Sequence, residues 1–72
     1  MNELHLKIQD VEYIVAELKK ELRRIKSAIN KLEKLDLIPP SEIIIKKENI
    51  EFELKGRKEE LKALKKVAKL IN

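Results

Sequence analysis

The sequence predicts an all-α protein: an antiparallel two-helix coiled-coil hairpin that dimerises into a four-helix bundle. Three observations support this fold class. Charged residues make up 42% of the 72-residue chain and a single glycine serves all of it, a composition typical of long helices. Apolar residues recur with alternating spacings of four and three in both halves of the chain. Two adjacent prolines, Pro39 and Pro40, separate the halves.

The first helix is expected over about residues 3–36. Its apolar residues keep the heptad rhythm without a break, which indicates one continuous apolar seam along the helix. Asp36 then falls on the next position of that seam and ends the pattern. The seam consists of Leu4, Ile8, Val11, Val15, Leu18, Leu22, Ile25, Ile29 and Leu32.

A turn is expected over residues 37–41, because the residue before a proline is pushed toward extended backbone. Ser41 is a good residue to cap the helix that follows. We expect the chain to reverse direction here and to lay the second helix antiparallel to the first.

The second helix is expected over about residues 42–71 and continues the heptad, with Lys47 and Arg57 filling two gaps. Its apolar seam consists of Ile43, Ile50, Leu54, Leu61, Leu64, Ala68 and Ile71. We expect the antiparallel pair to place Ile25 opposite Leu54 and Ile8 opposite Ile71.

Strands near 42–46 and 50–55 are the alternative for this part of the chain. Residues 43–45 form a β-branched run, and apolar and charged residues alternate over 50–55. Such a helix–β-hairpin–helix resembles prefoldin-type architecture, and this resemblance implies a prefoldin-like cochaperone. The helix is favoured, because the two halves then match in length.

Apolar residues beyond the seam gather on one flank, whereas the opposite flank is mostly polar. Such an asymmetric flank is typical of a protein–protein contact. We expect it to join two hairpins into a homodimer, or to bind another protein chain. The expected interface residues are Ile14, Ala28, Leu35, Ala63, Val67 and Leu70.

Basic residues cluster in the segment KKELRRIK, residues 19–26, and the chain carries a formal net charge of +4. A small basic nucleic-acid-associated protein, a regulator or chromatin-like factor, is therefore the second hypothesis. Its weakness is that only Tyr13 and Phe52 could stack on bases. The candidate phosphate contacts are Lys19, Lys20, Arg23, Arg24 and Lys58.

Charged residues on the polar flank are expected to pair across the hairpin. In the expected register Glu12 faces Lys65, and both charges attract. Lys26 faces Glu51 in the same way. Lys19 instead faces Lys58, and this pair repels.

Several classes of function are disfavoured by residues that are rare in this sequence. There is no cysteine and only His5 among histidines, so neither a zinc site nor a cysteine or serine–histidine nucleophile is expected. We predict a protein without enzymatic activity or a cofactor.

No apolar run is long enough to span a membrane, and no signal-peptide pattern begins the sequence, so we expect a cytoplasmic protein. The bias toward Lys, Ile and Glu is typical of thermophiles.

Overall fold

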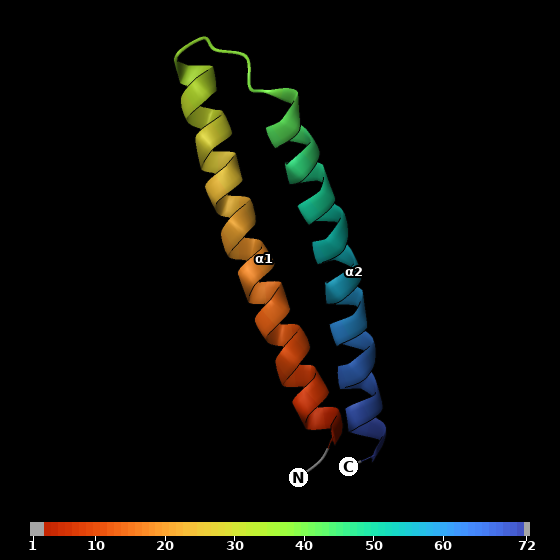
Figure 1. Cartoon of the computed structure of the whole chain (residues 1–72). Helices are drawn as coiled ribbons and strands as arrows, with labels where there is room; N and C mark the ends of the chain where they lie inside the picture. The colour runs from red at the N-terminus through yellow and green to blue at the C-terminus, as the bar shows by residue number, and fades with distance from the viewer. Residues whose placement is uncertain (1–2, 72) are drawn as a thin grey trace.

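The computed structural model describes residues 3–71, which form two long helices lying side by side and joined by a short loop (Figure 1). Helix α1 spans Glu3–Lys34 and helix α2 spans Ser41–Ile71. The molecule is a rod of 54 × 16 × 15 Å. Both chain ends lie at one end of the rod and the loop lies at the other. The predicted all-α helical hairpin is confirmed.

The alternative with strands near 42–46 and 50–55 is wrong, because α2 is helical throughout both ranges. The helix buries Ile50 and Leu54 against α1. It leaves Phe52, which a strand would have placed on the same face as both, 82% exposed. The heptad spacing therefore decides the structure here over the β propensity of the individual residues. The prefoldin-like reading loses its basis.

The seam predicted from the heptads is the contact between the helices. Its best-buried members within the described chain are Val11, Val15, Ile25, Ile50 and Leu54, and Val11 is fully buried. Almost all other seam residues are half-buried, including Lys47 and Arg57. The exception is Ile71, which is 64% exposed.

The register of the two helices differs from the predicted one. Leu54 packs in a cluster with Val11 and Val15, and Ile25 lies outside that cluster. The predicted pairing of Ile25 with Leu54 is therefore wrong, and the exposure of Ile71 argues against its predicted pairing with Ile8.

Two of the three ion pairs between the helices also depart from the predicted register. Lys46 Nζ lies 3.3 Å from Glu21 Oε1. In the predicted register these residues would lie about 18 Å apart along the axis, at ~1.5 Å per residue. This pair and that of Lys7 with Glu60 require α2 to be shifted along α1 by on the order of a heptad, although Lys65 still pairs with Glu12 as in the predicted register. A seam that repeats every heptad stays continuous after such a shift, so its spacing alone does not define the register.

A local backbone motif ends α1 slightly before the expected residue 36. Asp36 adopts a left-handed conformation with φ of 58°. The Asp36 amide donates to the Glu33 carbonyl at 3.0 Å, and the Leu37 amide donates to the Leu32 carbonyl at 2.9 Å. These two bonds form a Schellman motif with Asp36 in the position that glycine usually occupies.

The start of α2 also differs in detail from the prediction. Ser41 is the first residue of the helix rather than its cap. The Pro40 carbonyl accepts hydrogen bonds from the Ile43 amide at 3.1 Å and the Ile44 amide at 3.4 Å. Glu42 in the first turn suits the positive end of the helix dipole.

Replacing Asp36 by glycine should stabilise the protein. Asp36→Gly relieves the left-handed conformation and removes a negative charge from the negative end of the α1 dipole, together worth about 1 kcal/mol. Asp36→Asn removes the charge alone and should give a smaller gain. Urea denaturation followed by circular dichroism measures both. A loss of stability in Asp36→Gly would contradict this account of the cap.

Replacing Gly56 by alanine should also stabilise the protein. Gly56 lies inside α2, and a Cβ atom added there meets no other atom within 4 Å. Alanine in a helix interior is favoured over glycine by about 1 kcal/mol. The same denaturation experiment should show this gain. A destabilised Gly56→Ala would mean that something packs closely against this position.

Candidate functional site

A groove of about 470 Å³ lies beside the seam and is bordered mainly by α1. We call it the apolar groove. Its apolar lining consists of Tyr13, Ile14, Leu18, Ile25, Ala28 and Ile43. Its charged rim consists of Glu17, Lys20, Glu21, Arg24 and Lys46.

The heptad explains why a groove forms here. Ile14 and Ala28 flank the seam on the same side of α1. Ile14 lies four residues before Leu18, and Ala28 lies three residues after Ile25, so each is about one helical turn from a seam residue. Ala28 is too small to fill the space between the helices, and Ile43 from α2 forms the far wall. The result is an apolar surface continuous with the seam but open to solvent.

One ion pair crosses the groove, between Lys46 of α2 and Glu21 of α1 at 3.3 Å. Both side chains are about half exposed, so the pair contributes only about 0–1 kcal/mol to stability. The pair also matters for the charge of the rim, since Glu17, Lys20 and Arg24 are the rim residues that form no ion pair with another described residue.

The structure brings together only part of the predicted interface. Ile14 and Ala28 lie in the apolar groove. Leu35 lies at the loop end of the rod, where it is exposed. Ala63, Val67 and Leu70 are exposed near the other end, on the last turns of α2. The predicted flank is therefore a groove with an exposed apolar patch toward each end of the rod.

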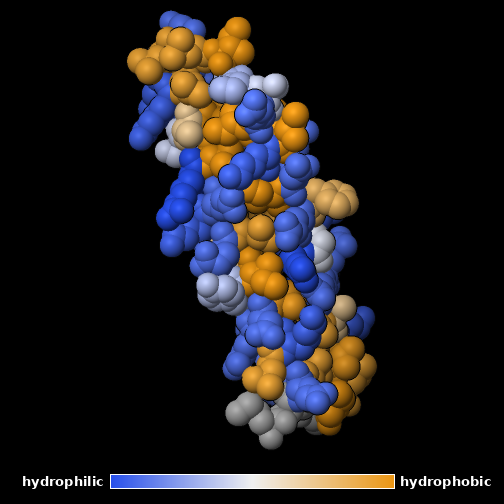
Figure 2. All heavy atoms as spheres, viewed as in Figure 1, coloured by the Kyte–Doolittle hydropathy of each residue, from blue (hydrophilic) through white to orange (hydrophobic). Residues whose placement is uncertain are grey.

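Two apolar patches mark these ends (Figure 2). The loop patch consists of Leu35, Leu37 and Ile38, and Ile38 is 92% exposed. The terminal patch consists of Val67, Leu70 and Ile71. Between them the charged side chains border the apolar seam.

Sequence reasoning missed Tyr13 and Ile43 as groove residues. Tyr13 lies outside the seam and is 67% exposed, and Ile43 was assigned to the seam alone. The signal for Tyr13 was its position next to Ile14, on the flank already identified as apolar. No signal existed for Ile43, because its place opposite Ala28 depends on the register of the two helices.

All five candidate phosphate contacts are exposed, and they border two shallow depressions. Lys19, Arg23 and Lys58 line one of them together with Lys26. Lys20, Arg23 and Arg24 line the other, together with Lys31. Neither depression has a carboxylate in its lining. Arg23 lies at both, so the two depressions form one basic face.

The predicted pairs on the polar flank are confirmed only in part. Lys65 Nζ lies 3.4 Å from Glu12 Oε2, as expected. Lys26 and Glu51 are not among the ion pairs of residues 3–71. Lys19 and Lys58 line the same depression, so these like charges do face one another.

Ion pairing at the centre of α2 involves Glu60. Its carboxylate lies 2.9 Å from Arg57 Nη1 within the helix and 4.0 Å from Lys7 Nζ on α1. This pairing lets Arg57 occupy a seam position with its charge satisfied at the edge.

Neither helix, over the residues described, is long and apolar enough to cross a membrane.

Comparisons with known proteins give this chain no relative. No protein-family model, curated protein or solved structure matches the sequence or the fold.

Proposed function

We propose that this protein is a non-enzymatic assembly module that self-associates through the apolar groove, so that two hairpins form a four-helix bundle of the coiled-coil type. The observation that supports the proposal is the small core. Only five apolar side chains of the described chain are buried, while the apolar groove beside them is open. Small domains without disulfides or metals commonly obtain the missing burial by association.

The shape of the hairpin supports the same conclusion. In a two-helix rod each helix buries only the side that faces the other helix. The residues on the flank of the seam therefore stay exposed. A second hairpin stacked on that flank provides the second layer of a four-helix bundle. The groove is open and shallow, which suits a helix better than a small substrate. Within this proposal the module acts in the cytoplasm, as expected from the sequence.

Dimerisation can be tested by sedimentation at tens of micromolar, where the expected mass is about twice the 8.5 kDa of the chain. Ile14→Glu should shift the protein to monomer, because it places a carboxylate in the apolar groove, where burial of an unpaired charge is costly. This variant and the parent chain are compared by circular dichroism, so that loss of helix is not mistaken for dissociation.

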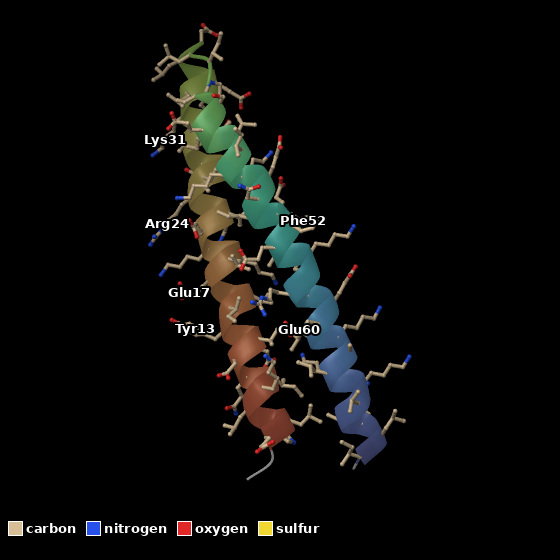
Figure 3. The ribbon with its side chains drawn as sticks, turned by 45° about the vertical axis from the view of Figure 1, so that its right-hand side comes forward. Tyr13, Glu17, Arg24, Lys31, Phe52 and Glu60 are labelled. Atoms are coloured by element: carbon tan, nitrogen blue, oxygen red, sulfur yellow. The ribbon has the colours of Figure 1, made fainter. Side chains whose placement is uncertain are left out.

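The matched control is Phe52→Glu. Phe52 is also a large apolar residue of a helix, but it points away from α1 on the outer side of α2 (Figure 3). This variant should remain dimeric. A parent chain that is monomeric at these concentrations, with a melting temperature independent of concentration, would refute the proposal.

Nucleic-acid binding is a second candidate, because the basic face joins Lys19, Lys20, Arg23, Arg24 and Lys58 without an intervening carboxylate in the depressions. A phosphate backbone could follow such a face. With no aromatic side chain in either depression, the binding would be electrostatic, independent of base sequence and sensitive to salt.

Titration of fluorescent duplex DNA tests this candidate. Binding at ~50 mM salt should weaken steeply by ~200 mM, as expected when phosphate contacts release counterions. Lys19→Gln combined with Arg23→Gln should weaken it at every DNA sequence tested, whereas Lys62→Gln, on α2 and outside both depressions, should have less effect. No binding at the lower salt concentration would remove the candidate.

A further inference from the structure

The charges along the groove side of α1 change sign at the middle of the helix. Residues spaced by one heptad on this side are acidic in the first half and basic in the second: Glu3, Asp10, Glu17, Arg24 and Lys31. Glu17, Arg24 and Lys31 lie along one side of α1 together with Tyr13 (Figure 3). The stripe therefore has a negative part, from Glu3 to Glu17, followed by a positive part formed by Arg24 and Lys31.

These charges form no ion pair with another residue of the described chain. The ion pairs of the described residues join Glu60 to Lys7 and Arg57, Glu21 to Lys46, and Glu12 to Lys65. None of them uses Asp10, Glu17, Arg24 or Lys31, and all four are exposed. These four residues thus place opposite charges at matched distances from a point between Lys20 and Glu21.

A stripe of this kind is complementary to itself when one copy is turned end over end. We infer that the occupant of the apolar groove is a second copy of this chain, with its α1 antiparallel on the first α1, so that Glu17 of each copy meets Arg24 of the other and Asp10 meets Lys31. This rests on the proposed dimerisation and specifies its geometry. A two-fold axis between Lys20 and Glu21 produces each contact twice.

The same arrangement also places complementary residues opposite one another in the rest of the groove. Tyr13 of one copy lies level with Ala28 of the other, so a large exposed ring meets the small residue that leaves the groove open. At the axis, Lys20 of each copy meets Glu21 of the other. The loop patch of one hairpin lies over the terminal patch of its partner, because loop and chain ends are at opposite ends of the rod.

Placing both loops at the same end is the other way to stack two hairpins, and the charges disfavour it. It lays α1 of one copy on α2 of the other. Arg24 and Lys46 line the same groove, so the Arg24 side chains would then face lysines. Glu60 lies at the level of Lys7 on α1, so Asp10 would face a glutamate. Like charges in contact disfavour a partner orientation.

Charge reversal at the two central positions tests the geometry by sedimentation equilibrium. Glu17→Arg gives two like-charge contacts in the two-fold dimer, and so does Arg24→Glu. Each variant alone should raise the dimer dissociation constant by about tenfold or more. An equimolar mixture of the two variants should recover association to within about threefold of the parent chain, since a mixed dimer again pairs opposite charges at both contacts.

Matched controls reverse charges on the opposite flank: Glu48→Arg for the first variant and Lys62→Glu for the second. Both positions are exposed and outside the apolar groove, so the controls should associate like the parent chain. Circular dichroism confirms that each variant keeps its helices.

The outcomes separate this inference from the proposed function. If the parent chain dimerises but the single reversals do not weaken it, or if mixing them does not restore association, the antiparallel α1 geometry is overturned and dimerisation stands. If the parent chain is monomeric, both the proposed dimerisation and the antiparallel α1 geometry are refuted. Weakening by each reversal with recovery in the mixture supports the geometry.

Discussion

The packing of Leu54 against Val11 and Val15 is the contact on which the rest of the hairpin depends. It contains the only fully buried side chain of the described chain, Val11, and it sets the height at which α2 lies beside α1. This axial position of α2 determines which side chains form ion pairs between the helices. The place of Ile43 as a wall of the apolar groove follows as well.

The same contact explains why so much apolar surface stays exposed. Two helices in contact can bury one stripe each, and residues beside those stripes remain on the surface. Here the neighbouring residues are apolar on one side, and the apolar groove and the two end patches result. This flank also carries a stripe of charges that reverses sign and forms no ion pair among the described residues, and both features support the proposed association with a second copy.

The basic face lies partly on the same side of α1 as this stripe. Arg24 belongs to both the rim of the apolar groove and a basic depression. An association that covers Arg24 would leave Lys19, Arg23 and Lys58 on the polar flank of the seam available for phosphate. The two candidate functions therefore compete for Lys20, Arg24 and Lys31, which line a basic depression and also lie in the inferred dimer contact.

Much of this architecture could be predicted from the sequence, because the heptad identifies the helices and the side of each that is buried. Ile50 and Leu54 were assigned to the seam despite their strand-like neighbours, and they are buried. The register could not be predicted, since shifting Leu54 by one heptad along α1 preserves the apolar seam. For the candidate site, Ile14 and Ala28 could be found from the flank. Ile43 could not, because its position depends on that register.

The cap at Asp36 bears on how the chain reaches this register during folding. Its closing bonds span only residues 32–37, so the loop-closure entropy they require is small and the reversal can form before distant contacts do. Once α1 is stopped at Lys34, sliding α2 by a heptad would require one helix to unwind and the loop to lengthen. A few backbone bonds outside the seam thus limit how far α2 can slide along α1.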